Sequence, residues 1–536
     1  MKMMKKMGIV AMCLVLLVLT ACGGKKSSDG GKKSDKDHLY IGLITSPGSF
    51  NPLNTLDVSG RFVQRYMYDA LLEMPEPLTF SPKLADSFET EDNQNYTIKL
   101  NKEAKWSDGQ PITAADVVFT YNLIANPVVE TTRGLAVSSL EGTQASGKLE
   151  AGLTEIPNLI AVDDQTVTLK TKVPVDPNYL KEVLGYGIFI LPKHVLENED
   201  PAKLANASFA MKPEVTSGPY QFVDYKKDSL VELKSNPDYY LGKAKIENVY
   251  FKIMNSANMA TEFQSGGLTM NASGGIGDIT FQDLETVKKM DNLEVTMSPN
   301  LNAYVMPMNI EVFTDPNIRL AIAHAINREQ IVEKLLKGNG EVIESIYTSQ
   351  NPYQNEKLKT IEYDVEKAKE YIKKSDYDMD REINLVVPLG NKVREQSANL
   401  IAEDLKAAGF KVKQTTYDFA TLMEKGRAGD FDLMLFGFGM PVDPDATSYY
   451  SIDGSANFTK YDSSKNEALL LAGKEEVDAD KRKVIYDELQ ELWQKDMPVL
   501  PLYSPKDVKV KDKNLEGGIT EFWQGSLENV NQWEMK

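Results

Sequence analysis

The stretch Ala104–Phe119 reads AKWSDGQPITAADVVF and combines a tight turn with the start of a helix. The pair Asp108-Gly109 favours a turn, and Trp106 lies beside it as an apolar anchor. Thr113 precedes the apolar helical positions and Asp116 follows three residues later, which is the pattern of a capped helix start. We therefore expect Trp106, Asp108, Gly109 and Asp116 to have a structural role in the core and no contact with a ligand.

Three further motifs follow along the chain, and together with this stretch they carry a resemblance to a known family. They are SGPY at Ser217–Tyr220, NPDYYLGK at Asn236–Lys243 and RLAIAHAINR at Arg319–Arg328. In this order, over more than 200 residues, the four motifs resemble the signatures of the family 5 extracellular solute-binding proteins. Members of that family are the peptide- and nickel-binding receptors of ABC importers.

The resemblance implies an α/β fold class, with a two-lobed, three-domain periplasmic-binding-protein-like fold, mixed sheets and a hinge. Domain I would be discontinuous and built from residues 39–80, 205–300 and 500–536. Domain II would comprise residues 81–204, and domain III would comprise residues 301–499. The two lobes of such a fold close over a ligand by a hinge motion.

Local patterns along the chain agree with an α/β architecture. Apolar or alternating runs predict strands at 39–44, 96–100, 166–170, 410–414 and 431–436. Apolar residues at helical spacing predict helices at 61–72, 318–325, 396–408, 419–426 and 485–493. Gly409 directly follows one of these helices as a C-cap glycine. Helices that alternate with strands indicate mixed α/β domains with covered sheets.

The composition excludes several classes of protein. The chain has 536 residues, enough for roughly two to four domains, and 42% of them are hydrophobic and can fill several cores. Lys and Arg number 60 against 78 Asp and Glu, a formal net charge of -18, so we expect no nucleic acid partner. Cys13 and Cys22 are the two cysteines, which excludes a disulfide framework and a cysteine-based zinc site.

The first 38 residues predict a lipoprotein signal followed by a tether. Residues 1–21 have a basic start, a short apolar run and a small-residue end, as a secretory signal peptide does. Leu19-Thr20-Ala21-Cys22 resembles a bacterial lipobox, which implies cleavage before Cys22 and lipidation of its thiol. Residues 22–38 would be a polar tether. We expect attachment by lipid to the outer face of the cell membrane, or to its periplasmic side if the cell has an outer membrane; an ordinary signal peptide with a chance cysteine is the alternative.

The sequence contains no motif typical of a catalytic or metal site. Gly-x-Ser-x-Gly, His-Glu-x-x-His and Gly-x-x-x-x-Gly-Lys-Ser/Thr are all missing. His38, His194 and His324 are scattered along the chain, and the acidic residues of 376–380 lack the glycine and glutamate of an EF-hand loop. We therefore expect no enzyme activity, no catalytic residue, no cofactor and no bound metal.

The resemblance also implies which residues contact the ligand. In oligopeptide receptors of the family, an acidic residue soon after a Gly-aromatic pair on a late loop holds the amino terminus of the peptide. That pair is Gly437-Phe438 here, the matching position is Pro441, and Asp443 or Asp445 could take over the contact. Phe419 and Phe438 stand where such receptors often carry tryptophan. The implied ligand site consists of Val58, Phe419, Phe438, Gly439, Asp443, Asp445 and Tyr503.

Part of this site has a purely structural alternative. Asp443-Pro444-Asp445 could equally be a plain turn, because Asp-Pro initiates turns by itself. Val58 and Tyr503 enter the site by their position in the chain, and either could equally belong to the core.

The function implied by the resemblance is that of a lipid-anchored receptor that captures peptides for an ABC importer. The peptide backbone would pair with exposed strand edges, a contact that is indifferent to side-chain identity. The partners would be a peptide or other small ligand and the permease subunits in the membrane, and we expect a monomer. Alternatives in the same class are a nickel chelate, a sugar or a signalling peptide, and the alternative from another class is a surface hydrolase.

Overall fold

The computed structural model describes residues 36–55, 57–389 and 391–536. The expected signal segment 1–21, the lipidation residue Cys22 and most of the expected tether lie outside these residues. Strand β1 (His38–Leu43) begins at the last residue assigned to the tether, so His38 belongs to the folded body, where it pairs with Asn248. No helix in the described part of the chain combines the length and the apolar character needed to cross a bilayer.

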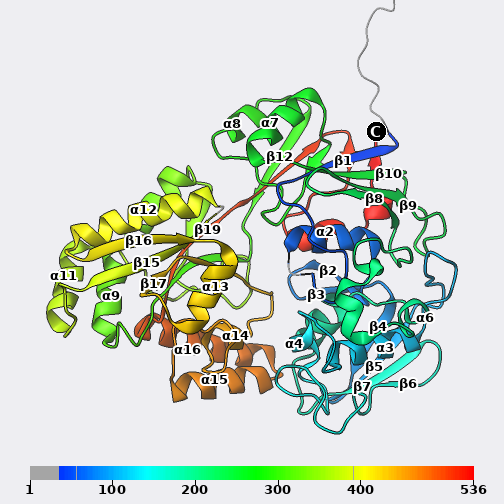
Figure 1. The fold of residues 1–536 in the computed structure, drawn as a ribbon, viewed down its shortest axis with the longest axis horizontal. Coiled ribbons are helices and arrows are strands. Elements are labelled where there is room, and N and C mark those ends of the chain that lie inside the picture. Colours follow the sequence, from blue (N-terminus) through cyan, green and yellow to red (C-terminus); the bar gives the residue numbers. More distant parts are fainter. Residues whose placement is uncertain (1–35, 56, 390) are drawn as a thin grey trace, which may run out of the picture. The chain divides into compact units, whose positions relative to one another are not determined.

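A seven-stranded mixed sheet brings together three distant parts of the chain (Figure 1). β1 is parallel to both of its neighbours, β10 and β11, and the remaining pairs are antiparallel. All its strands come from the three segments expected to form domain I, apart from His38. The order is β12 (Leu293–Ser298), β20 (Asp507–Asp512), β11 (Met270–Asn271), β1, β10 (Asn248–Ile253), β9 (Leu230–Ser235) and β8 (Tyr220–Lys226).

The same segments supply the helices and short elements near this sheet. α2 packs against β8, and α7 packs against α8. The elements are α2 (Val58–Met67), α7 (Ser256–Ser265), α8 (Leu284–Val287), β21 (Leu515–Glu516), β22 (Glu534–Met535) and the 3-10 helices η5 (Trp523–Leu527) and η6 (Val530–Gln532).

Residues 85–170 contain a four-stranded antiparallel sheet of their own. Its strands, in spatial order, are β4 (Ala85–Thr90), β5 (Asn95–Leu100), β7 (Thr166–Lys170) and β6 (Ile160–Ala161), which confirms the strands predicted at 96–100 and 166–170. Around it lie the hairpin β2 (Leu72–Glu76) and β3 (Thr79–Pro82), α3 (Ala114–Ala125), α4 (Gly134–Val137), α5 (Pro177–Leu180), the π-helix η1 (Lys181–Tyr186), α6 (Lys193–Leu196) and the 3-10 helices η2 (Pro201–Asn206) and η3 (Ser208–Ala210).

Residues 302–505 contain two further sheets. The parallel one has the order β16 (Lys411–Tyr417), β15 (Glu382–Pro388), β17 (Leu433–Met434), and helix α12 covers it (Figure 1). The antiparallel one has the order β14 (Gly340–Val342), β19 (Val499–Pro505), β13 (Asn302–Pro307), β18 (Phe436–Gly439). Because β19 pairs with β13, residues 500–505 belong with the segment expected to form domain III and not with domain I.

The helices of this segment confirm four predicted ones. α9 (Pro316–Ala325), α12 (Lys392–Ala407), α13 (Phe419–Ala428) and α16 (Ala479–Asp496) correspond to the helices predicted at 318–325, 396–408, 419–426 and 485–493. The others are α10 (Arg328–Gln330), the π-helix η4 (Ile331–Leu335), α11 (Val365–Lys374), α14 (Thr447–Tyr450) and α15 (Ser464–Glu475).

Two predicted elements are corrected by the structure. The helix predicted at 61–72 ends at Met67, because Tyr68 has an extended backbone and Leu72 begins β2. The strand predicted at 431–436 is two short strands in different sheets, β17 beside β15 and β18 beside β13. Leu435 lies between them, and its backbone N donates to Val386 O at 3.0 Å. The chain therefore passes from the parallel sheet to the antiparallel sheet at this residue.

The described residues fold around separate hydrophobic cores. The largest cluster is formed by residues 39–276 and 515–533, and no member of it lies between 277 and 514. Two other clusters consist of buried residues from 303–503. The segments expected to form domains II and III therefore have different cores.

The stretch 104–119 forms the turn and the helix start that its sequence indicates. Trp106 is buried, and Gly109 in the following turn has a positive φ of 88°, which glycine adopts without a steric penalty. Gln110 O accepts a hydrogen bond from Trp106 N at 2.8 Å. Asp116 accepts from Thr113 N at 2.8 Å, which caps α3. The stretch thus packs a turn and a helix against the largest core.

Candidate ligand-binding site

The carboxyl ends of the parallel strands β15 and β16 meet at one edge of their sheet. Leu389 follows β15 and donates its backbone N to Tyr417 O, the last residue of β16, at 2.8 Å. Phe419 follows shortly after as the first residue of α13. Leu389 and Phe419 are 54% and 58% exposed, although large apolar side chains are usually buried. Since ligands of open α/β sheets bind outside the carboxyl ends of the strands, these two side chains mark a candidate site.

Strand β18 lies beside this edge and has one side unpaired. Among the described residues it pairs only with β13, so the other side of its backbone faces no strand. Phe436 and Phe438 are buried, whereas Gly437 and Gly439 lie on the opposite face, because side chains alternate along a strand. That face carries no side chain from β18. An extended chain could pair with the backbone at the free edge of β18, next to this glycine face.

Arg394 places a positive charge next to this glycine face. It lies in the first turn of α12, where Asn391 accepts from its backbone N at 2.9 Å. Its guanidinium carbon is 5.0 Å from the ring centroid of Tyr304, and its Nη2 is 3.3 Å from the position that a Cβ on Gly437 would take. Its buried Nε has no hydrogen-bond partner, and no carboxylate of the described chain pairs with it. The charge is therefore available to an anionic group of a ligand.

Tyr503 and Phe438, two of the expected site residues, lie beneath this surface. The Tyr503 ring stacks on Tyr304 with centroids 5.0 Å apart, and its hydroxyl is 3.0 Å from Ser397 Oγ. Burial raises the pKa of Tyr503, so it remains a neutral phenol. Phe438 stacks on Tyr449 with centroids 4.0 Å apart. Tyr503 therefore packs against Tyr304, and Phe438 packs against Tyr449.

The remaining residues of the expected site lie at different places. Phe419 stacks on Phe436 with centroids 6.1 Å apart, whereas Gly439 is exposed at the end of β18 on the face opposite Phe436. Val58 is 44% exposed and begins α2, a helix of the largest core. The structural motif residue Asp108 lies elsewhere again, with its Oδ2 2.8 Å from His194 Nε2.

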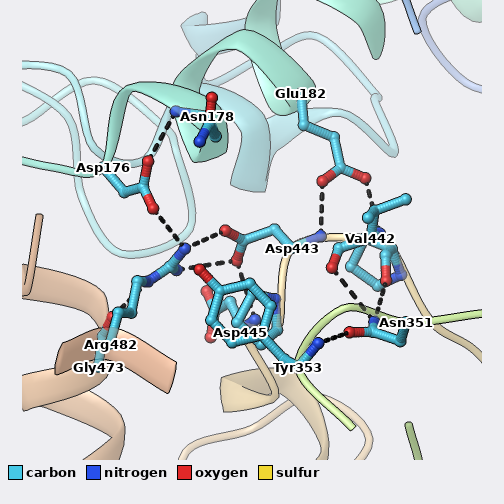
Figure 2. Close-up of polar contacts among 12 residues, drawn as sticks. Asp176, Asn178, Glu182, Asn351, Tyr353, Val442, Asp443, Asp445, Gly473 and Arg482 are labelled. Atoms are coloured by element: carbon cyan, nitrogen blue, oxygen red, sulfur yellow. Dashed lines mark hydrogen bonds and ion pairs between the residues drawn. The ribbon is translucent and has the colours of Figure 1, made fainter. Parts of the chain in front are cut away.

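Asp443, one of the two expected amino-terminal contacts, already has a partner within the chain (Figure 2). Arg482 donates from Nη1 and Nη2 to the two carboxylate oxygens of Asp443 at 2.6 and 3.1 Å. Both side chains are 1% exposed. Burial raises the pKa of Asp443, and the charge of Arg482 and its hydrogen bonds oppose that rise. Arg482 lies 39 residues further along the chain, so the local sequence around Asp443 does not predict this pair.

Asp445 is the more accessible of the two acidic residues. Its Oδ1 accepts from Thr447 N at 2.9 Å, and its side chain is partly exposed. This is the local turn contact that an Asp favours before a short helix, here α14. The structure thus keeps Asp445 near the surface and Asp443 inside.

Several residues of the site were missed from the sequence. Arg394 and Leu389 carry no motif, and the available signal was their place directly after the apolar run 383–387, which forms β15 and was not predicted as a strand. Arg482 and Glu182, which both contact the loop around Asp443, come from distant segments. Within residues 36–55, 57–389 and 391–536, no three His, Cys, Asp or Glu side chains are grouped so that they could hold a metal ion.

Comparisons with known proteins identify the family. Residues 79–460 match the model for bacterial extracellular solute-binding proteins, family 5 Middle. The chain is 28% identical over 559 residues to the oligopeptide-binding protein AppA of Bacillus subtilis (strain 168), with 98% of each protein covered. It is 23% identical over 547 residues to the dipeptide-binding protein DppE of the same strain, with 96% of this chain and 97% of that protein covered.

A solved structure extends this likeness to the fold. The structure of AppA from Bacillus subtilis in complex with a nonapeptide superposes with a TM-score of 0.79 at 26% identity, covering 93% of this chain and 99% of that one. The expected α/β fold with mixed sheets, as in periplasmic binding proteins, is confirmed. The family match spans well over half of the chain and includes the stretch 104–119. The chain belongs to the bacterial extracellular solute-binding proteins of family 5.

Proposed function

We propose that this protein is the peptide-binding receptor of an ABC importer and delivers its ligand to a membrane permease. The observation that carries the proposal is the unpaired side of β18 with its glycine face. A peptide in extended conformation would add to β18 as a further strand, and main-chain hydrogen bonds would supply much of the affinity. The names of the relatives, an oligopeptide-binding and a dipeptide-binding protein, and the nonapeptide in the AppA structure support a peptide ligand.

The surrounding residues would contact the side chains and the ends of the peptide. Phe419 and Leu389 offer exposed apolar surface at the carboxyl ends of β15 and β16. Val58 would approach the peptide from α2 when the lobes close. Arg394 would pair with a carboxylate of the peptide, and Asp445 is the better placed acidic residue for its amino terminus, since Asp443 is bound to Arg482. Phe438 and Tyr503 would support the site from below.

Main-chain pairing predicts a particular response to changes in the peptide backbone. Calorimetry would compare synthetic peptides of two to nine residues with copies that carry N-methyl groups at alternate residues. N-methylation removes the donor without changing the sequence, so copies methylated on the side facing β18 should bind at least about tenfold more weakly. Copies methylated at the other residues are the matched control. Equal affinity of both sets of peptides would contradict pairing of the peptide backbone with β18.

The ligand itself can be identified from purified protein. Native mass spectrometry should release peptides of mixed sequence, because backbone pairing does not select side chains. Release of a nickel chelate or a sugar would contradict peptide transport. Hydrolysis of added peptides over many turnovers would contradict a receptor without enzyme activity.

The proposed location rests on the sequence before residue 36. A lipid on Cys22 would hold the protein on the outer face of the cell membrane, next to its permease. Cys22→Ser should therefore move the protein from the membrane fraction into the medium or periplasm. Membrane retention of Cys22→Ser at the level of the unchanged protein would contradict lipid anchoring.

A further inference from the structure

Arg482 joins two acidic residues that belong to different parts of the chain (Figure 2). Its Nη1 donates to Asp176 at 2.9 Å and to Asp443 at 2.6 Å. Asp176 lies before α5 in the segment expected to form domain II, whereas Asp443 and Arg482 lie in the segment expected to form domain III. All three side chains are buried, so the charges attract one another with little screening by water.

Glu182 makes a second contact between the same two segments (Figure 2). Its carboxylate accepts from Val442 N at 2.9 Å and from Asp443 N at 2.7 Å. Glu182 comes from η1, directly after α5. The loop 440–445 is therefore held twice, by its backbone on Glu182 and by the Asp443 side chain on Arg482.

These contacts are surrounded by little other packing between the two segments. Their hydrophobic cores are separate, and among the described residues no helix or strand of 81–204 packs extensively on one of 301–499. A small apolar cluster lies alongside, formed by Met74, Tyr186, Leu301, Val442 and Phe522. Breaking the polar contact would therefore open this small cluster but neither of the large cores.

Each side of the contact also keeps a partner of its own when the two sides part. Arg482 retains both bonds to Asp443 and donates from Nε to Gly473 O at 2.8 Å. Asp176 retains the cap of α5, where its Oδ1 accepts from Asn178 N at 2.8 Å. Opening would return Asp176 and Glu182 to water and leave no bare charge buried. This is the property of a reversible contact and not of a fixed core.

The loop 440–445 follows β18 without a break, so the contact touches the proposed peptide site. We propose that Asp176, Glu182 and Arg482 form a latch that holds domains II and III closed, with the loop 440–445 linking the latch to a ligand on β18. The assignment of β18 as the peptide site rests on the proposed function, whereas the latch itself does not. In the closed protein, Arg482 and Glu182 act as positioning residues for the loop.

Hydrogen–deuterium exchange of the full chain without ligand tests the latch directly. Asp176→Asn removes the charge that Arg482 meets but keeps an oxygen that caps α5, and Glu182→Gln keeps the shape of its side chain. Each variant should speed exchange at the Val442 and Asp443 amides at least about tenfold, because it weakens a contact that holds the loop closed. The radius of gyration from small-angle scattering should rise in both, while exchange in β5 and β15 stays unchanged.

Asp200→Asn is the matched control. Asp200 also caps a short helix that begins with proline, accepts from Ala202 N at 3.1 Å and has no partner in domain III among the described contacts. It should leave exchange at Val442 and Asp443 unchanged. Unchanged exchange in Asp176→Asn and Glu182→Gln would overturn the latch, and so would equally faster exchange in β5 and β15, which would make the contact part of one core. Failure to bind any peptide would overturn the proposed function while leaving this result standing.

Discussion

Trp106 and Arg482 are both almost completely buried, but their surroundings are opposite. Trp106 lies in the largest hydrophobic cluster, next to a turn and a helix from its own stretch of chain. Arg482 lies between carboxylates, and its partners come from residues 176 and 443. The apolar contact needs only packing, whereas the ionic contact needs two separate segments to be aligned. Trp106 therefore stabilises one core, whereas Arg482 connects two segments that have separate cores.

Replacement of Arg482 should have the largest effect on stability. Arg482→Met leaves Asp176 and Asp443 buried without a counterion, so the free energy of unfolding should fall by about 4 kcal/mol. Denaturation in urea measures the loss. Adding Asp176→Asn and Asp443→Asn to Arg482→Met should recover part of it, because the cost lies in unpaired charge. If the triple variant is as unstable as Arg482→Met, the lost free energy of unfolding comes from packing and not from unpaired charge, which would contradict the ionic role of Arg482.

Trp106→Ala should cost slightly less, about 3 kcal/mol, through the cavity it leaves in the largest cluster. No side-chain hydrogen bond is lost, because Trp106 Nε1 has no partner. Thermal unfolding without peptide measures the change, and Trp106→Phe is the control that should lose less. A Trp106→Ala protein with unchanged stability and no peptide binding would contradict the structural role.

Glu182 should make stability depend on pH. Burial, with the charge of Asp443 next in importance, raises the pKa of Glu182 to about 7, while hydrogen bonds from the loop backbone and the charge of Arg482 oppose the rise. A raised pKa means that the folded protein binds the proton more tightly than the unfolded chain, so this stabilisation is full below about pH 4.5 and is lost as the pH rises through about 7.

The matched variant isolates this contribution. Between pH 5 and pH 8 the wild type should lose about 2 kcal/mol more of its free energy of unfolding than Glu182→Gln, whose side chain does not titrate. Asp69, whose pKa burial raises to about 6, titrates in the same range in both proteins and cancels in the difference. Parallel pH profiles for the two proteins would show that Glu182 has no raised pKa.

Arg394 should contribute to affinity and leave stability almost unchanged. Arg394→Gln should weaken binding of a peptide with a free carboxyl terminus by about tenfold, since one charge-assisted contact is lost. The amidated copy of the same peptide should bind both proteins equally. Arg427→Gln on the exposed side of α13 is the control. An equal loss of affinity for the free and the amidated peptide would mean that Arg394 does not bind the terminal carboxylate.

The same contrast explains what the sequence could predict. The turn at Asp108-Gly109, the helix that ends before Gly409 and the strands at 96–100 and 166–170 depend on neighbours within a few residues, and all are found where expected. The strand predicted at 431–436 failed because its two halves pair with different sheets. The pairing strands β13 and β15 lie far away in the sequence, so the local pattern of apolar residues does not indicate which sheet each half joins.

The expected ligand site shows the same division. Phe419 and Gly439 were expected from the family resemblance, and both are exposed in the structure. The accessibility of Asp443 could not be judged, because Arg482 and Glu182 approach it from 39 and 261 residues away. Arg394 was overlooked because no sequence motif marks it, and its buried Nε without a hydrogen-bond partner is visible only in the structure.

The order of strands in the seven-stranded sheet sets a limit on when that sheet can form during synthesis. β1 is made first, but β20, which lies between β12 and β11, is made only at residues 507–512. At about 5 to 20 residues per second, the ribosome needs roughly 25 to 90 s to pass from one to the other. Before that interval ends, β1 already has both of its neighbours, β10 and β11, whereas β12, made at residues 293–298, still waits for β20 as its pairing strand in this sheet.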